Sequence, residues 1–175
     1  MGSQKFKDFM DKNYPEKAGD IVDISSGKVV GKHSGISKYT LGQRKGLGVG
    51  GGYGTSGECW FVVKKNIKSN ILYVAQGTDD ALYSNALIAN KFNWIEFQDA
   101  DSFECYAKFR YRQTMQKVSV QKQDGLVYIE FAEKQRAVTP GQYAVLYISL
   151  ENGGYKCIGG GQIDVVIKDG TPLDL

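Results

Sequence analysis

The sequence predicts a mainly β protein built of two small β-domains, and three observations carry this prediction. Among 175 residues there are 22 glycines and only three prolines, a composition that suits many tight turns between short strands. Apolar residues make up 42% of the chain and include 11 tyrosines and eight phenylalanines, so the domains can bury cores. From residue 19 onward, short apolar runs alternate with turn signals. Two small barrels are the architecture that this pattern favours.

A short helix is expected before these domains, over Gln4–Lys12. Phe6, Phe9 and Met10 recur there at i, i+3 and i+4, the spacing of one helix face. Pro15 ends the pattern. A segment of this length cannot be a domain, so its apolar face needs another domain to cover it.

Strands of the first domain are expected on either side of two turns. Ser25–Gly27 separates the first pair, and Asn66–Asn70 separates a second pair that is a hairpin by its length and turn chemistry. The predicted strands are Asp20–Asp23, Val29–Lys32, Trp60–Lys65 and Ile71–Gln76.

A second set of strands begins near Leu87 and continues to the C-terminus. The polar segment Asp79–Asn85 between the sets is the best domain boundary. We therefore divide the chain into a leading segment (1–18), a first domain with a glycine-rich loop (19–84) and a second β-domain (85–175). The predicted strands of the second domain are Phe103–Arg112, Gln116–Lys122, Leu126–Phe131, Gln142–Ser149 and Tyr155–Lys168, the last broken at glycines 159–161.

The most unusual segment is Tyr39–Gly52, in which Gln43, Arg44 and Lys45 precede closely spaced glycines. Glycine accepts positive φ and lets backbone N–H groups approach an anion or another chain. The segment is neither a dinucleotide fingerprint nor a P-loop, because no buried strand precedes it and neither a helix nor Gly-Lys-Ser/Thr follows. The two alternatives are a packed turn that meets phosphate or nucleic acid and a flexible linker.

Charge is sorted into blocks, although the net charge is only +3. Residues 26–68 hold eight cations and one acid, and residues 105–122 hold five cations and no acid. Such blocks indicate a face that binds a polyanion; ordinary solvated lysines are the alternative. Three scattered cysteines and one histidine offer no zinc site and favour a reducing cytoplasm. No apolar run is long enough to span a membrane, so no membrane partner is expected.

The predicted strand Phe103–Arg112 places cations on one face. Period-two geometry sets Lys108, Arg110 and Arg112 about 6.6–6.8 Å apart on the outer face, while Cys105 points into the core. A row of cations at this spacing can follow a nucleic-acid backbone. The alternative is an exposed strand whose cations pair with acids across the sheet.

A type II turn is predicted at Thr139–Gln142. Pro140 presets φ for the first central position, and Gly141 supplies the positive φ of the second. Gln142 then stands at the mouth of a strand, where its amide either reaches a base edge or is simply solvated.

Six ordered segments carry a resemblance that covers nearly the whole chain. They are His33–Gly35, Tyr39–Leu47, Leu72–Gly77, Lys108–Gln113, Arg136–Gln142 and Cys157–Gly161. Together they closely resemble the C-terminal half of bacterial tRNA-specific 2-thiouridylases.

The resemblance implies part of an enzyme that replaces the C2 oxygen of the wobble uridine of certain tRNAs with sulfur. In the family, ATP adenylates that oxygen, and a cysteine persulfide delivers the sulfur with the help of a second cysteine. A sulfur-relay protein or cysteine desulfurase loads the persulfide. ATP, usually with Mg²⁺, binds an N-terminal domain, while a central domain and a C-terminal barrel like those of translation elongation factors help to hold the tRNA.

This chain departs from the family pattern before its β-domains. It has no Ser-Gly-Gly-x-Asp-Ser loop, so the ATP site is expected to lie outside it. Gly2–Phe9 resembles the remainder of the segment that carries the family's persulfide cysteine. Cys59, Cys105 and Cys157 match neither catalytic position. The chain is therefore expected to bind no cofactor and to be inactive alone.

What carries over residue by residue is a set of tRNA contacts. The family's Arg-Tyr pair matches Arg110 and Tyr111, and the glutamine of its Pro-Gly-Gln turn matches Gln142. Strand alternation points Tyr111 inward, so this pair reaches RNA only if the strand ends or bulges near Tyr111. With the outer-face cations and the motif before the glycines added, the expected tRNA-binding residues are Gln43, Arg44, Lys45, Lys108, Arg110, Tyr111, Arg112 and Gln142.

Two other classes of function stay open. An enzyme of another kind would need a nucleophile–base pair or a metal cluster, and the sequence offers neither. A free-standing RNA-binding or translation-factor-like β-barrel module is the second, and the apolar face of helix Gln4–Lys12 argues against it.

Overall fold

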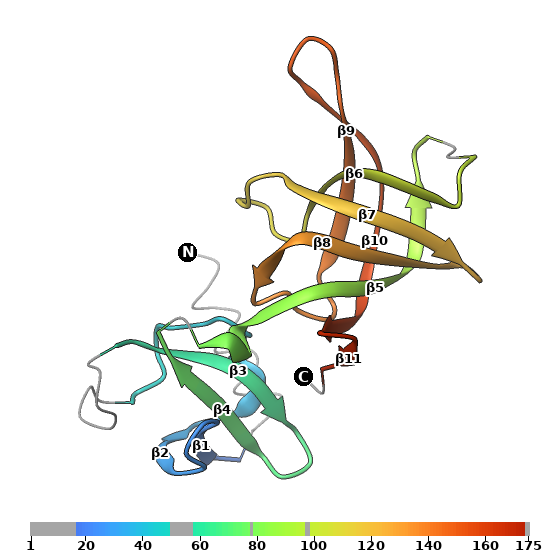
Figure 1. Cartoon of the computed structure of the whole chain (residues 1–175). Coiled ribbons are helices and arrows are strands. Elements are labelled where there is room, and N and C mark those ends of the chain that lie inside the picture. Colours follow the sequence, from blue (N-terminus) through green and yellow to red (C-terminus); the bar gives the residue numbers. More distant parts are fainter. Residues whose placement is uncertain (1–16, 50–57, 78, 97–98, 174–175) are drawn as a thin grey trace, which may run out of the picture. The chain divides into compact units, whose positions relative to one another are not determined.

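A computed structural model describes residues 17–49, 58–77, 79–96 and 99–173 (Figure 1). The chain divides into two compact units between Leu82 and Tyr83. Strands dominate both units, and the described helices are two single 3-10 turns, η1 (Ile36–Lys38) and η2 (Asp80–Leu82). The predicted mainly β fold is confirmed, whereas the helix expected over Gln4–Lys12 lies outside the described residues.

The first unit contains a four-stranded sheet in the order β2-β1-β4-β3. Its central strands β1 and β4 run parallel, and the other neighbours are antiparallel. Every strand lies within one residue of its predicted bounds, because the flanking turns were readable from the sequence. The strands are β1 (Gly19–Asp23), β2 (Val29–His33), β3 (Trp60–Asn66) and β4 (Ile71–Gln76).

The glycine-rich segment is packed against this sheet as far as Val49. Tyr39, Leu41 and Leu47 are buried in one hydrophobic cluster with strand residues such as Val62. Burying these three side chains stabilises the turn by the transfer of apolar area from water. The described part of the segment is therefore a packed turn and not a flexible linker, and glycines 50–52 lie outside the described residues.

The second unit is a closed antiparallel barrel of six strands (Figure 1). Its strands follow the order β10-β5-β8-β7-β6-β9, and β9 pairs again with β10 to close the ring. A short strand β11 pairs with the end of β10. Closure removes exposed sheet edges and confirms the predicted barrel. The strands are β5 (Tyr83–Trp94), β6 (Ser102–Lys108), β7 (Gln116–Gln123), β8 (Leu126–Arg136), β9 (Tyr143–Ser149), β10 (Tyr155–Lys168) and β11 (Thr171–Pro172).

One expectation about β10 is wrong, because the strand continues through glycines 159–161. These glycines allow β5 to cross closely: an added Cβ would lie 2.7 Å from the carbonyl oxygen of Asn93 at Gly159 and 2.5 Å from the Phe92 ring at Gly161. Residues with a side chain would push the two strands apart, so the glycines permit the barrel's closure instead of ending its longest strand.

Cys105 points into the barrel, as its alternation predicted, and only 7% of it is exposed. Burial raises the pKa of its thiol to about 12, an effect that a backbone hydrogen bond from Tyr147 partly offsets.

We therefore expect Cys105 to react with iodoacetamide at neutral pH on the order of 100-fold more slowly than half-buried Cys59 and Cys157, because the thiolate is the nucleophile. Mass spectrometry of peptides from briefly labelled protein measures these rates, and labelling in urea, where all three thiols should react alike, is the control. Equal rates in the native protein would contradict the burial of Cys105.

Candidate nucleic-acid interface

Two loops of the barrel are joined by the side chain of Arg110. The loop after β6 carries Arg110, whose Nη2 donates a hydrogen bond to the carbonyl oxygen of Ala137, in the loop after β8. The same oxygen accepts a bond of 3.0 Å from the hydroxyl of Thr139. A guanidinium suits this role because its rigid fork of donors can hold one partner while it presents charge to another. Arg110 thus braces the 109–115 loop against the 137–142 loop.

Hydrogen bonds between glutamine side chains support the 109–115 loop. The side-chain oxygen of Gln113 accepts a hydrogen bond of 2.9 Å from the Phe109 amide, and its nitrogen donates to Oε1 of Gln135 at 2.7 Å. Gln135, which is buried, donates in turn to Oε1 of Gln116 at 3.0 Å. Each amide in the chain both accepts and donates, so the network orders the loop without leaving its buried groups unsatisfied. No local pattern in the sequence marks this network, because its members come from separate strands and loops.

The prediction of a straight row of cations is wrong, because β6 ends at Lys108. The last pair of β6 with β9 joins Lys108 to Val145, and the chain then turns, with a hydrogen bond of 3.2 Å from the Gln113 amide to the Arg110 carbonyl. Tyr111 is therefore not an inward strand residue: 93% of it is exposed. Because the strand ends at Lys108, strand alternation does not apply to Tyr111, and its side chain can face RNA as the family pattern implies.

The predicted tRNA-binding cations Lys108, Arg110 and Arg112 all lie in or directly before the 109–115 loop. Burial of the Arg110 guanidinium lowers its pKa from the ordinary value, and the nearby charge of Arg136 lowers it further. Within the described ranges, neither Lys108 nor Arg112 forms an ion pair with a carboxylate, so cross-strand pairing does not occupy these two cations. Neighbouring positive charges repel one another, and a bound anion lowers the free energy of that repulsion, so this group of cations suits an anionic ligand.

The predicted turn at Thr139–Gln142 is present and is fixed to β10. Gly141 has φ +86°, and the Gln142 amide donates to the Thr139 carbonyl at 3.3 Å, as a type II turn requires. Two further bonds with Ile163 hold it: the Gly141 amide donates to the Ile163 carbonyl at 2.8 Å, and the Ile163 amide donates to the Gln142 carbonyl at 2.7 Å. The backbone that carries Gln142 is thus rigid at the mouth of β9.

In the first unit, Gln43 has a different role from its neighbours. Its side-chain oxygen accepts from the Thr40 amide at 3.0 Å, and its nitrogen donates to the Lys45 carbonyl at 2.9 Å. Its backbone oxygen accepts from the Val62 amide at 3.0 Å, which ties the turn to β3. Gln43 therefore shapes the loop from within, while Arg44 and Lys45 are exposed at its tip.

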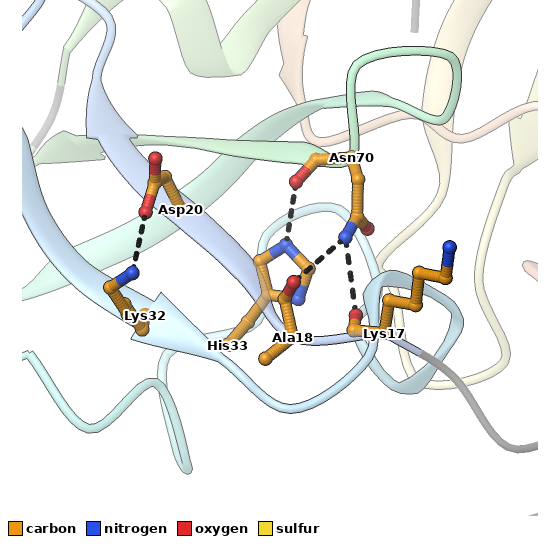
Figure 2. A network of polar contacts seen from close by, with 6 residues as sticks. All are labelled: Lys17, Ala18, Asp20, Lys32, His33 and Asn70. Carbon is orange, nitrogen blue, oxygen red and sulfur yellow. Dashed lines mark hydrogen bonds and ion pairs between the residues drawn. The ribbon is translucent and has the colours of Figure 1, made fainter.

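A polar network around buried His33 holds the chain where it enters the first sheet (Figure 2). Nδ1 of His33 accepts a hydrogen bond of 3.2 Å from the Gly35 amide, so Nε2 carries the proton and donates to the carbonyl oxygen of Asn70 at 3.1 Å. The Asn70 side chain donates to the carbonyl oxygens of Lys17 at 3.2 Å and Ala18 at 3.1 Å. His33, in one of the six recognised segments, is thus a structural residue, and sequence reasoning missed its partner Asn70.

The ion pair drawn beside this network, between Lys32 and Asp20 at 3.6 Å, is exposed. Exposed pairs of this kind contribute about 0–1 kcal/mol. The hydrogen bonds from the Asn70 side chain, not this pair, fix the position of residues 17 and 18.

Comparison with known proteins assigns both units. Residues 7–76 match the family model described as the tRNA methyl transferase PRC-barrel domain, and residues 84–163 match the one described as the aminomethyltransferase beta-barrel domain. The chain is 48% identical over 177 residues to tRNA-specific 2-thiouridylase MnmA of Oceanobacillus iheyensis, covering 99% of this chain and 45% of that protein. It is 50% identical over 171 residues to MnmA of Halalkalibacterium halodurans, covering 96% of this chain and 43% of that protein.

The chain belongs to the tRNA-specific 2-thiouridylase family. This confirms the resemblance to the central and C-terminal domains of these enzymes. The chain spans less than half the length of the 2-thiouridylases it matches.

Two features are absent from the described residues. No helix there is long and apolar enough to cross a membrane. In the same residues, no group of three or more His, Cys, Asp or Glu side chains is placed to hold a metal ion.

Proposed function

We propose that this chain is the tRNA-binding part of a tRNA-specific 2-thiouridylase, and that the whole enzyme replaces the C2 oxygen of the wobble uridine with sulfur. One observation carries the proposal: Arg110 braces the loop of exposed Tyr111 against the loop of Gln142, at a cationic end of the barrel. The identity of about half of all aligned residues to named 2-thiouridylases supports it.

Each side chain has a distinct task in this proposal. The ring of Tyr111 stacks on an unpaired base of the anticodon region, and the amide of Gln142 hydrogen-bonds a base edge or the backbone. Lys108 and Arg112 neutralise phosphates and release counterions, which makes the binding salt-dependent. Arg44 and Lys45, in the first unit, attract the same RNA through their charge.

The chemistry of sulfur transfer is assigned to residues outside this chain. ATP with Mg²⁺ does not fit the residues present, because the sequence has no phosphate-binding loop and the described side chains include no acidic cluster for a metal. Cys105 is buried, and none of the three cysteines forms a pair that could relay a persulfide. Persulfide loading by a sulfur-relay protein or cysteine desulfurase is therefore a property proposed for the whole enzyme. A tRNA partner and unpaired cysteines suit a cytoplasmic protein.

Binding of this chain to tRNA tests the proposal. We expect salt-sensitive binding that prefers a glutamate or lysine tRNA with a wobble uridine over a tRNA that lacks it, measured by fluorescence anisotropy at two salt concentrations, since an affinity without its salt dependence is uninterpretable. Absent binding, or binding that does not weaken with salt, would overturn the proposal. Equal binding of both tRNAs would assign the selectivity to the rest of the enzyme.

The same chain is expected to form no 2-thiouridine when it is supplied with ATP and a sulfur donor. Mass spectrometry of digested tRNA detects the thiolated nucleoside, and an intact family member serves as the positive control. Thiolation by the chain alone would mean that its own cysteines or loops perform the chemistry, contrary to the proposed division.

A further inference from the structure

A second exposed tyrosine lies beside the proposed site. Tyr143 is the first residue of β9 and follows Gln142 directly, and 63% of it is exposed. Among the described residues its ring has no aromatic partner, unlike Tyr106 and Tyr155, which pack edge to face. A large exposed ring on the outside of a closed barrel has a free face to offer a ligand.

The register of the barrel places this ring next to the cations. β6 and β9 are neighbours in the barrel (Figure 1), and Lys108 pairs directly with Val145. Directly opposed residues of an antiparallel pair share a face of the sheet, and so do residues two apart along one strand. Tyr143 and Lys108 are therefore outward diagonal neighbours, with their Cα atoms roughly 7–8 Å apart. If β6 had continued beyond Lys108, residue 110 would have paired with Tyr143.

The backbone under Tyr143 is held in place before any ligand arrives. Tyr143 pairs with Gln162 of β10, and the turn before it is fastened to Ile163. A tyrosine on a rigid strand loses little conformational freedom on binding, because only two side-chain torsions remain to be fixed.

We propose that Tyr143 and Lys108 form a subsite for one further nucleotide with an unpaired base, which stacks on the Tyr143 ring while Lys108 contacts its phosphate. The inference rests on the proposed tRNA-binding function and extends it along β9, from the Tyr111 and Gln142 loops to the barrel wall. Charge complementarity selects the occupant, since residues 105–122 carry five cations and no acid. Stacking on an aromatic ring accepts any base, so this subsite adds affinity and not sequence preference.

The test uses the whole chain, an anticodon stem–loop RNA and a blunt duplex with the same stem. Tyr143→Leu should weaken binding of the stem–loop about tenfold, leave binding of the duplex unchanged and leave the salt slope as it was, because stacking is not ionic. Tyr143→Phe should bind like the parent chain.

Lys108→Ala should lower the magnitude of the salt slope by about one phosphate contact. Tyr155→Leu is the matched control, an outward tyrosine near the opposite end of β9 and β10 that should leave binding unchanged.

A direct readout covers the case in which Tyr143→Leu folds poorly. In Tyr143→Trp, the added fluorescence should be quenched by the stem–loop and not by the duplex, with the parent chain as the blank. Unchanged affinity of Tyr143→Leu, or no quenching of Tyr143→Trp, while the parent chain binds tRNA in a salt-dependent way, would overturn the subsite and leave the proposed function standing. Failure of the parent chain itself to bind would overturn both.

Discussion

Replacing Arg110 by alanine is expected to weaken tRNA binding about thirtyfold while changing its salt dependence by less than one phosphate contact. The guanidinium donates to the Ala137 carbonyl, so its removal leaves that oxygen with only the hydroxyl of Thr139. A hydrogen bond to a charged group contributes about 2 kcal/mol, which is about thirtyfold in affinity if the bound state needs both loops in place. Arg110 is on this view a positioning residue, and Lys108 and Arg112 contact the phosphates.

A salt series separates this role from direct contact with phosphate. Affinities of the Arg110→Ala and Arg112→Ala variants for one tRNA would be measured from low to moderate salt. Arg112→Ala should lower the magnitude of the slope by about 0.7–0.9, with a smaller loss of affinity. A slope that falls by a full contact in Arg110→Ala would contradict the brace and assign Arg110 to a phosphate.

Coupling provides the second check on Arg110. Because it acts through the loop that carries Gln142, the double variant Arg110→Ala/Gln142→Ala should bind more tightly than the product of the single losses predicts. Residues in one hydrogen-bonded network show interaction energies of about 0.5–3 kcal/mol. Strict additivity would mean that the two loops contact the RNA independently.

Replacing Gly19 by alanine is expected to destabilise the first unit by about 3 kcal/mol. The new Cβ would lie 2.1 Å from the carbonyl oxygen of Asn70 and 2.6 Å from Nε2 of His33. That oxygen belongs to the backbone and already accepts the His33 hydrogen bond, so it can move only if the network around His33 opens. Overpacking costs about 1–3 kcal/mol, and a broken buried hydrogen bond adds to that cost.

Denaturant unfolding followed by the fluorescence of buried Trp60 reports on this unit, with Trp94→Phe in all variants to silence the barrel. Gly31→Ala is the matched control, since its Cβ would meet chiefly a movable methyl of Val49 at 3.2 Å, and it should cost less than about 1 kcal/mol. A Gly19→Ala variant as stable as that control would show that the network around His33 is loose.

Sequence reasoning succeeded wherever a strand is bounded by local turn chemistry and failed where pairing partners decide. The bounds of Ile71–Gln76 and Tyr155–Lys168 were both predicted as observed. The start of β5 was misplaced: the strand begins at Tyr83, inside the polar segment read as a boundary, and not near Leu87, because its partners β8 and β10 come much later in the chain. Likewise, nothing local in Phe103–Arg112 marks Lys108 as the last paired residue.

The sequence by itself determined the β class, the barrel and the 2-thiouridylase family, because alternation, turn residues and motif order are written in neighbouring residues. It also singled out Arg110, Tyr111 and Gln142. Only the tertiary structure decided what these residues do: Tyr111 is outward because β6 ends where the barrel ends, and Arg110 is a brace because residue 137 lies beside it. The physical reason is that strand ends, burial and hydrogen-bond partners are set by contacts between segments far apart in the chain.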